Sequence, residues 1–216
     1  GATTLGQSRQ HPPPTTVTVT SSIAPIGAMC RALKLPNCPS GIVEETFFGL
    51  TADSSSFLVQ DAPSGRWDLL GSKPLHAMLS AISPITIRVG GTFTDVTSMP
   101  GPRPGISKHE PNQYNFSAVG WAAMNHLVQR LPGSQLVVSL NGLLRHWDQK
   151  DIPWDPTNAK AFIADNIAQG YEIYGYELGN EPGCWGSHGG NVPAQIHAQD
   201  FGVLQGLLAD AYPDVS

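Results

Sequence analysis

Four short apolar runs with the composition of β-strands alternate along this chain with four segments of helical spacing. The strand-like runs cover residues 46–51, 85–89, 135–140 and 173–178. The helical segments cover 73–82, 117–130, the stretch between Pro156 and Gly170, and 193–212. Repetition of strand, helix and strand indicates βαβ units, whose strands pair in parallel. Because the strands are mostly apolar, both faces of the sheet are expected to be covered, so the sequence predicts an α/β protein.

Residues typical of caps mark the helix ends. Ser117 is a candidate N-cap, Asp155 and Pro156 form a candidate N-cap and first helical residue, and Gly170 is a candidate helix stop. Three helices carry apolar residues at helical spacing. The expected core residues are Leu75, Met78, Leu79 and Ile82 in the first helix, Val119, Ala122, Ala123, Leu127 and Leu131 in the second, and Ile196, Phe201, Leu204, Leu207 and Leu208 in the last.

Two folds fit this order of elements. A doubly wound nucleotide-binding sheet needs a glycine-rich turn after its first strand, whereas residues 52–56 read ADSSS. A (β/α)8 barrel carries its active site on loops after the strands, and the long loops 90–115, 141–154 and 179–192 all follow strands. The barrel is therefore favoured. Since such a barrel needs about 250 residues, we expect residues 46–216 to form roughly its first half, with four βα units.

The first 45 residues are rich in Thr, Ser and Pro, and they are expected to lie outside the barrel. Residues 15–20 (TTVTVT) have the period-2, β-branched pattern of a strand. No hairpin partner lies nearby, so this run either pairs with a distant strand or belongs to a disordered leader.

Composition excludes several classes of protein. No basic stripe is present that would indicate a nucleic-acid partner, and no apolar run is long enough for a transmembrane helix. A signal peptide is not expected either, because no charged segment followed by an apolar run begins the sequence. The seven histidines show no zinc-ligand spacing, and no G-x-S-x-G motif or P-loop occurs, so neither a metal nor an organic cofactor is expected. Cys30 and Cys38 could pair in an oxidising compartment or remain thiols, and Cys184 is the third cysteine.

The segment with the clearest catalytic character is 176–182, YELGNEP. Asn180 and Glu181 follow the fourth predicted strand, where a barrel enzyme places catalytic groups. We expect Leu178, Trp185 and Pro182 to exclude water from Glu181, which would raise its pKa toward the range of a general acid. The Asn180 amide could donate to a sugar hydroxyl. The alternative is a solvated loop that leads into a helix.

Two further segments follow predicted strands. In 87–95 (IRVGGTFTD), Arg88 lies within a strand pattern, where its charge requires an acceptor, and we expect it to face a carboxylate on another strand. An Arg side chain directed to the surface is the alternative. In 140–145 (LNGLLR), Asn141 could point into the same opening, although an Asn in a simple turn explains that segment equally well.

These segments together resemble glycoside hydrolase family 79, the heparanase-like retaining glycosidases with a (β/α)8 barrel. The matching stretches are GSKPL (71–75) with Ser83-Pro84, RVGGTFTD (88–95), SLNGLLR (139–145), WDPTNA (154–159) and GYEIYGYELGNEP (170–182). Their order and spacing match over about residues 46–212. The resemblance implies that Glu181 is the acid/base, that Asn180 contacts the sugar, and that Thr92 and Asp53 contact substrate. Arg88 and Asn141, chosen from their positions in and after predicted strands, complete the expected substrate-binding residues. It also implies that residues 15–20 form a strand of a β-sandwich.

The resemblance implies retaining hydrolysis without a cofactor. The family's nucleophile is a second Glu on a later strand, which we do not expect among these 216 residues, so the chain by itself is expected to be inactive. Because Lys108, Arg145 and Lys150 are scattered, a glucuronide or another uronic-acid glycan is the expected substrate class rather than heparan sulfate. A non-catalytic carbohydrate-binding module or a truncated remnant is the alternative. Family members are often secreted, lysosomal or membrane-associated, and the sequon at 115–117 (NFS) is compatible with that.

Overall fold

The computed structural model describes residues 48–57, 70–100, 114–149, 151–188 and 190–213. All of them belong to one compact unit that spans Glu44–Ser216. The predicted leader 1–45, its candidate strand 15–20, Cys30 and Cys38 lie outside the described residues. The boundary proposed at residues 45 and 46 therefore stays a prediction.

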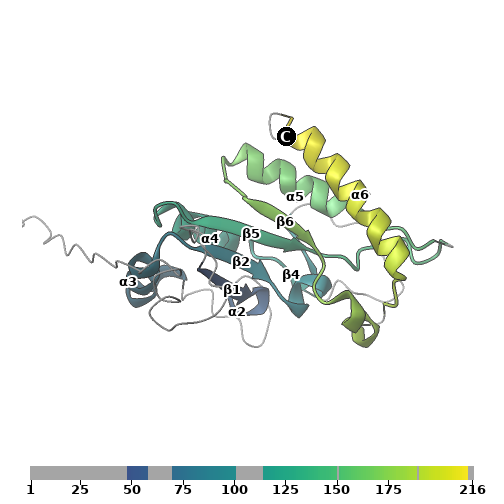
Figure 1. Ribbon diagram of the computed structural model, residues 1–216, viewed down its shortest axis with the longest axis horizontal. Coiled ribbons are helices and arrows are strands. Elements are labelled where there is room, and N and C mark those ends of the chain that lie inside the picture. Colours follow the sequence, from purple (N-terminus) through teal and green to yellow (C-terminus); the bar gives the residue numbers. More distant parts are fainter. Residues whose placement is uncertain (1–47, 58–69, 101–113, 150, 189, 214–216) are drawn as a thin grey trace, which may run out of the picture. The chain divides into compact units, whose positions relative to one another are not determined.

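The central sheet contains four parallel strands, β1 (Gly49–Asp53), β2 (Thr86–Gly90), β5 (Gln135–Leu140) and β6 (Gly175–Leu178), as Figure 1 shows. Their spatial order β1-β2-β5-β6 is also their order in the sequence, so every crossover steps to the next position in the same direction. A doubly wound sheet instead reverses direction at a switch point. The topology is that of a partial (β/α) barrel, which confirms the predicted fold class.

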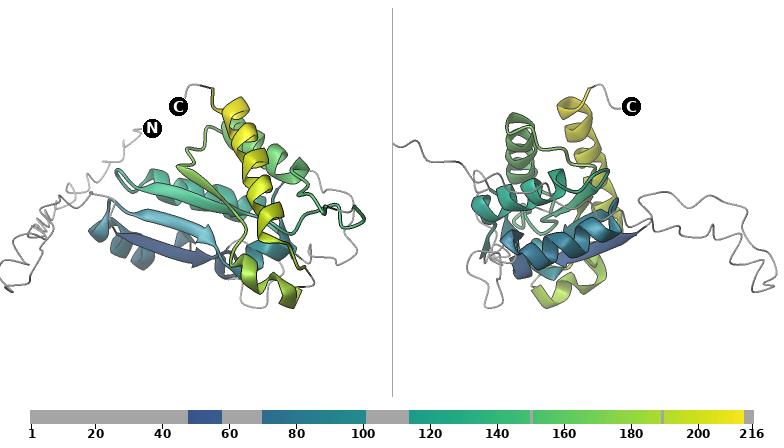
Figure 2. Two further views of the ribbon diagram at one scale, coloured as in Figure 1. Left: turned by 45° about the vertical axis from the view of Figure 1, so that its right-hand side comes forward. Right: turned by 90° about the vertical axis from the view of Figure 1, so that its left-hand side faces the viewer.

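Four helices pack against one face of this sheet: α3 (Lys73–Ile82), α4 (Ala118–Gln129), α5 (Thr157–Ala168) and α6 (Ala194–Ala211). Their buried side chains form one cluster with alternate residues of the strands, because successive strand residues point to opposite faces. α5 and α6 lie side by side beside β6 (Figure 2). The buried cluster includes Leu79, Ile87, Val89, Trp121, Met124, Leu127, Leu136, Val138, Leu140, Phe162, Ile163, Leu178 and Leu204.

The opposite face of the sheet is polar and is the face that a barrel turns inward. The register places Arg88 of β2 beside Val137 of β5, and Ser139 of β5 beside Glu177 of β6. This face is formed by Thr51, Asp53, Thr86, Arg88, Gln135, Val137, Ser139, Gly175 and Glu177. Charged side chains are therefore collected on the inner face, and apolar ones beneath the helices.

The long loops contain short elements that the sequence pattern did not predict. Asp53 is followed by α2 (Ser54–Phe57), and β2 is followed by η3 (Thr92–Val96) and β3 (Thr97–Ser98). β3 pairs in parallel with β4 (Tyr114–Asn115). The loop after β6 folds into η4 (Pro182–His188). These elements surround the carboxyl ends of the strands.

Most predicted element boundaries are close to those observed, with three corrections. The first strand runs to Asp53 rather than ending at residue 51, and the last begins at Gly175 rather than 173. Ser117 caps α4 as predicted, since its Oγ accepts a hydrogen bond from Gly120 N at 3.1 Å. The cap of α5 is Pro156, one residue after the predicted Asp155, although Asp155 Oδ1 still accepts from Thr157 N. Gly170 ends the helical segment with a left-handed φ of 69°.

Some residues assigned to the core from helical spacing are exposed instead. Met78 and Ile82 of α3, Val119 of α4 and Phe201 of α6 are 69%, 54%, 68% and 47% exposed. Helical spacing identifies the apolar side of a helix, but how many residues on that side are buried depends on which elements pack against it.

Among the described residues, every helix is too short or too polar to cross a membrane.

Candidate active site

Arg88 joins the inner face of the sheet to the loop after β6. Its Nε donates to both carboxylate oxygens of Glu177, at 2.7 and 3.0 Å, and its Nη2 donates to Asn180 Oδ1 at 3.2 Å. β5 lies between β2 and β6, so these contacts cross a strand. The expectation that Arg88 faces a carboxylate on another strand is confirmed, and that carboxylate is Glu177.

A buried carboxyl group, Asp95 of η3, joins three loops. It accepts hydrogen bonds from Asn180 N at 3.0 Å, Trp185 Nε1 at 2.8 Å and, more weakly, Gly142 N at 3.4 Å. Burial raises the pKa of Asp95 to about 6, and these hydrogen bonds and the charge of Arg88 oppose the rise. Sequence reasoning quoted this residue within a motif but gave it no role. The signal available was an ionisable residue placed just after two glycines at a strand end.

Trp185 of η4 fills the space beneath the loop that carries Glu181. Its ring is 1% exposed, and its indole N–H also lies 2.9 Å from Asn180 O. A methyl group added at Gly142 or Gly179 would overlap the ring, and Gly179 has a φ of 75°. The two glycines are needed because the backbone passes directly against the indole.

A buried ion pair supports Trp185 from the side of α6. Arg145 Nη2 contacts Asp200 Oδ2 at 2.6 Å, and Arg145 also donates to Gly142 O and Ile152 O at 2.8 and 3.0 Å. The Arg145 guanidinium lies 5.6 Å from the centre of the Trp185 ring, and the His197 ring meets it edge to face at 4.9 Å. Burial and the charge of Arg145 lower the pKa of His197, so this imidazole is neutral at pH 7.

Glu181 lies on the loop between β6 and η4, three residues after Leu178. Its φ of 47° is left-handed, which is uncommon for a residue other than glycine, and its carbonyl accepts a hydrogen bond from Cys184 N at 2.7 Å. The expectation that neighbouring residues exclude water from Glu181 is wrong for this chain. Glu181 is exposed, because Leu178 and Trp185 pack into the interior, and the desolvated acid of this region is Asp95.

The remaining predicted site residues have different surroundings. Asp53 is the last residue of β1, half-buried, and its Oδ1 accepts from Ser55 N at 2.9 Å. Thr92 begins η3 and is exposed. Asn141 is buried, with its Nδ2 donating to Thr97 O and its Oδ1 accepting from Leu143 N.

Within the described part of the chain, no three His, Cys, Asp or Glu side chains are grouped so that they could hold a metal ion.

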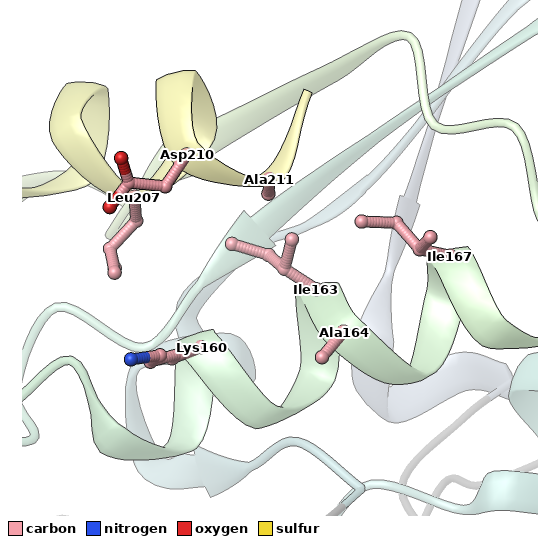
Figure 3. Close-up of a pocket in the computed structure, with 7 residues that line it drawn as sticks. All are labelled: Lys160, Ile163, Ala164, Ile167, Leu207, Asp210 and Ala211. Atoms are coloured by element: carbon pink, nitrogen blue, oxygen red, sulfur yellow. The ribbon is translucent and has the colours of Figure 1, made fainter. Parts of the chain in front are cut away.

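A groove on the helix side of the sheet is separate from these residues. Figure 3 shows Ile163 and Ile167 of α5 and Leu207 and Ala211 of α6 along it, with Lys160 and Asp210 also lining it. None of its lining residues belongs to the loops after the strands.

Comparison with known proteins identifies the family of the chain. A model described as "Glycosyl hydrolase family 79, N-terminal domain" matches residues 66–216. The chain belongs to glycosyl hydrolase family 79. It is 26% identical to heparanase-like protein 3 of Arabidopsis thaliana over 197 residues, which cover 82% of this chain and 36% of that protein. The family predicted from the motifs is confirmed, and the family 79 chain spans about a third of the length of this curated relative.

Proposed function

We propose that this chain supplies the acid/base of a retaining glycoside hydrolase that acts on glucuronides or uronic-acid-containing glycans, and that Glu181 is this residue. The observation that supports the proposal is the position of Glu181. Its side chain is exposed after the carboxyl end of β6, and the preceding residue, Asn180, is bonded by both Arg88 and Asp95. Barrel enzymes carry their catalytic groups on loops at this end of the strands.

In the first half-reaction, Glu181 donates its proton to the glycosidic oxygen while a second carboxylate attacks the anomeric carbon. The bond between that carbon and the leaving oxygen breaks, and an alcohol departs. In the second half-reaction, the Glu181 carboxylate takes a proton from water, which displaces the enzyme carboxylate with overall retention. We propose that this second carboxylate is a Glu on a later strand of the barrel than β6, as the resemblance to the family implies.

Asn180 is suited to contact a sugar hydroxyl because one end of its amide is already fixed. Its Oδ1 accepts a hydrogen bond from the Arg88 guanidinium, so the Nδ2 at the other end of the amide points away from Arg88. Among the described residues, no protein group accepts a hydrogen bond from this Nδ2. A neutral amide N–H held in this way can donate to a hydroxyl without rearrangement.

The other predicted contacts divide by exposure. Thr92 is exposed and Arg88 keeps 27% of its side chain exposed, so both are proposed to contact substrate. Asp53 is half-buried at the end of β1 and remains a proposed contact. Asn141 uses both polar atoms on backbone groups, so we propose that it shapes the loop after β5.

The leaving-group dependence of Glu181→Gln in the intact enzyme tests the proposal. On an aryl β-glucuronide with a poor leaving group, we expect kcat/KM to fall by about 10²–10⁴-fold, since proton donation contributes that much. With an activated phenol, which leaves without a proton, the fall should be much smaller. Glu172→Gln, at an exposed Glu before β6, is the matched control and should retain activity. Equal losses on both substrates, or no loss, contradict the assignment.

Substrate class is tested separately by comparing aryl glucuronides with the matching neutral glycosides. Hydrolysis of glucuronides is expected, and binding of uronic-acid glycans without cleavage would favour the carbohydrate-binding alternative. We also propose that residues 1–216 expressed alone show negligible turnover, because one carboxylate of the retaining pair is missing. Robust hydrolysis by this chain alone would contradict that statement.

A further inference from the structure

Asp95 is a buried carboxyl group that takes no direct part in the proposed reaction. Its side chain is 1% exposed, and its contacts are with the protein's own loops, so it cannot touch a sugar in this structure. The inference below rests on the proposed function, because it concerns how Glu181 is held.

The two strongest hydrogen bonds to Asp95 come from either side of Glu181 in the sequence. Asn180 N precedes Glu181 directly, and Trp185 Nε1 follows it by four residues. The Glu181 carbonyl closes the turn between them by accepting from Cys184 N. Both ends of the segment that carries Glu181 therefore meet one carboxyl group. Hydrogen bonds to an ionised acceptor are about twice as strong as neutral ones, which makes this contact important for the geometry of the loop.

Glu181 needs such support because of its backbone. Its φ of 47° is left-handed, which is unfavourable for a residue other than glycine and persists only where the surroundings enforce it. The hydrogen bond from Asn180 N to Asp95 is made by the residue next to this strained position.

Trp185 can transmit the constraint because its ring has little freedom to move. Gly142 and Gly179 lie against it, Arg145 contacts it from the loop after β5, and His197 contacts it from α6. If Asp95 is removed, the indole N–H keeps only Asn180 O, and Asn180 N loses its acceptor. A buried donor without a partner is unfavourable, and the loop can relieve this by shifting.

We propose that Asp95 is a positioning residue that fixes the orientation of Glu181 by accepting hydrogen bonds from the backbone before it and from the Trp185 indole after it. The consequence is specific. Displacing Glu181 impairs proton donation to the leaving group, whereas a general loss of structure impairs the reaction of every substrate.

The experiment compares Asp95→Ala and Asp95→Asn with wild type in the intact enzyme, on aryl β-glucuronides with poor and activated leaving groups. For Asp95→Ala we expect kcat/KM to fall about 10–100-fold on the poor leaving group and less than threefold on the activated one, as for a displacement of about 1 Å. Asparagine keeps one acceptor oxygen for Asn180 N and Trp185 Nε1, so Asp95→Asn should recover most of the loss. Asp155→Asn removes a buried carboxyl at the start of α5 and should leave the ratio of the two rates unchanged.

Equal losses on the two substrates, or no loss in a folded variant, overturn the proposal. If Asp95→Ala does not fold, Trp185→Phe replaces it as the test variant, because it removes the hydrogen bond between Trp185 and Asp95 from the Trp185 side. It should lower kcat/KM selectively on the poor leaving group, as expected for Asp95→Ala. Glu181→Gln is measured alongside. If that variant shows the leaving-group dependence and the Asp95 variants do not, the positioning role fails and the proposed function stands. If Glu181→Gln shows no dependence, the proposed function itself fails.

Discussion

Replacing Asp95 by asparagine should remove a defined part of the pH dependence of folding. The pKa of Asp95 is raised from 3.8 to about 6 by burial in the folded chain. A difference of about two units corresponds to roughly 3 kcal/mol, because one pKa unit is worth about 1.36 kcal/mol. The group is 1% exposed, so solvent screening does not reduce this figure much.

The sign follows from proton binding. The folded state holds the proton more tightly than the unfolded state, so Asp95 favours folding below about pH 4, and this contribution is lost as the pH rises through 6. Asparagine does not titrate. The free energy of unfolding of wild type minus that of Asp95→Asn should therefore fall by about 2.5 kcal/mol between pH 4 and pH 7, because the carboxyl of the unfolded chain is already partly ionised at pH 4.

Urea unfolding at pH 4, 5, 6 and 7, followed by far-ultraviolet circular dichroism, measures this difference. Trp185→Phe provides a second test, since the Trp185 hydrogen bond lowers the pKa of Asp95 and its loss should move the transition to higher pH. A difference between wild type and Asp95→Asn that stays constant over this range, or that rises with pH, would refute the reasoning.

Two further predictions concern the support of the loop. Gly179→Ala should destabilise the fold by about 1–3 kcal/mol, because the added Cβ would overlap the Trp185 ring and the φ of residue 179 is left-handed. Gly183→Ala is the control, since a Cβ at residue 183 meets no neighbouring atom and should change the free energy of unfolding little. Urea unfolding compares the two variants, and equal effects would contradict the packing of Gly179 against Trp185. Asp200→Asn should cost about 3–5 kcal/mol by leaving Arg145 buried without its charge partner, and a thermal midpoint equal to wild type would contradict this.

The sequence predicts those parts of the fold that depend on local pattern. Residues 135–140 form β5 and residues 73–82 form α3 as expected. The spacing of apolar residues that distinguishes a strand from a helix is set by residues close together in the sequence. Arg88 was expected to face a carboxylate because a charge within a strand needs a partner, and Glu177 meets that need.

Other features depend on contacts between distant residues. Asp95 bonds Gly142, Asn180 and Trp185, which are 47, 85 and 90 residues away, and no local pattern joins them. The exposure of Val119 and Glu181 likewise depends on which elements pack beside them. The motif placed Glu181 at the end of a strand, but the group that holds it there could be recognised only in three dimensions.

Azide rescue of Glu181→Ala tests the acid/base assignment most directly. Azide attacks a glycosyl-enzyme without general-base assistance, so it can replace water when the base is absent. With an activated aryl β-glucuronide and the intact enzyme, we predict that azide restores turnover and that the product is the β-configured glucuronosyl azide, as double displacement requires. Turnover that azide does not change, or an azide product of α configuration, would contradict the assignment of Glu181.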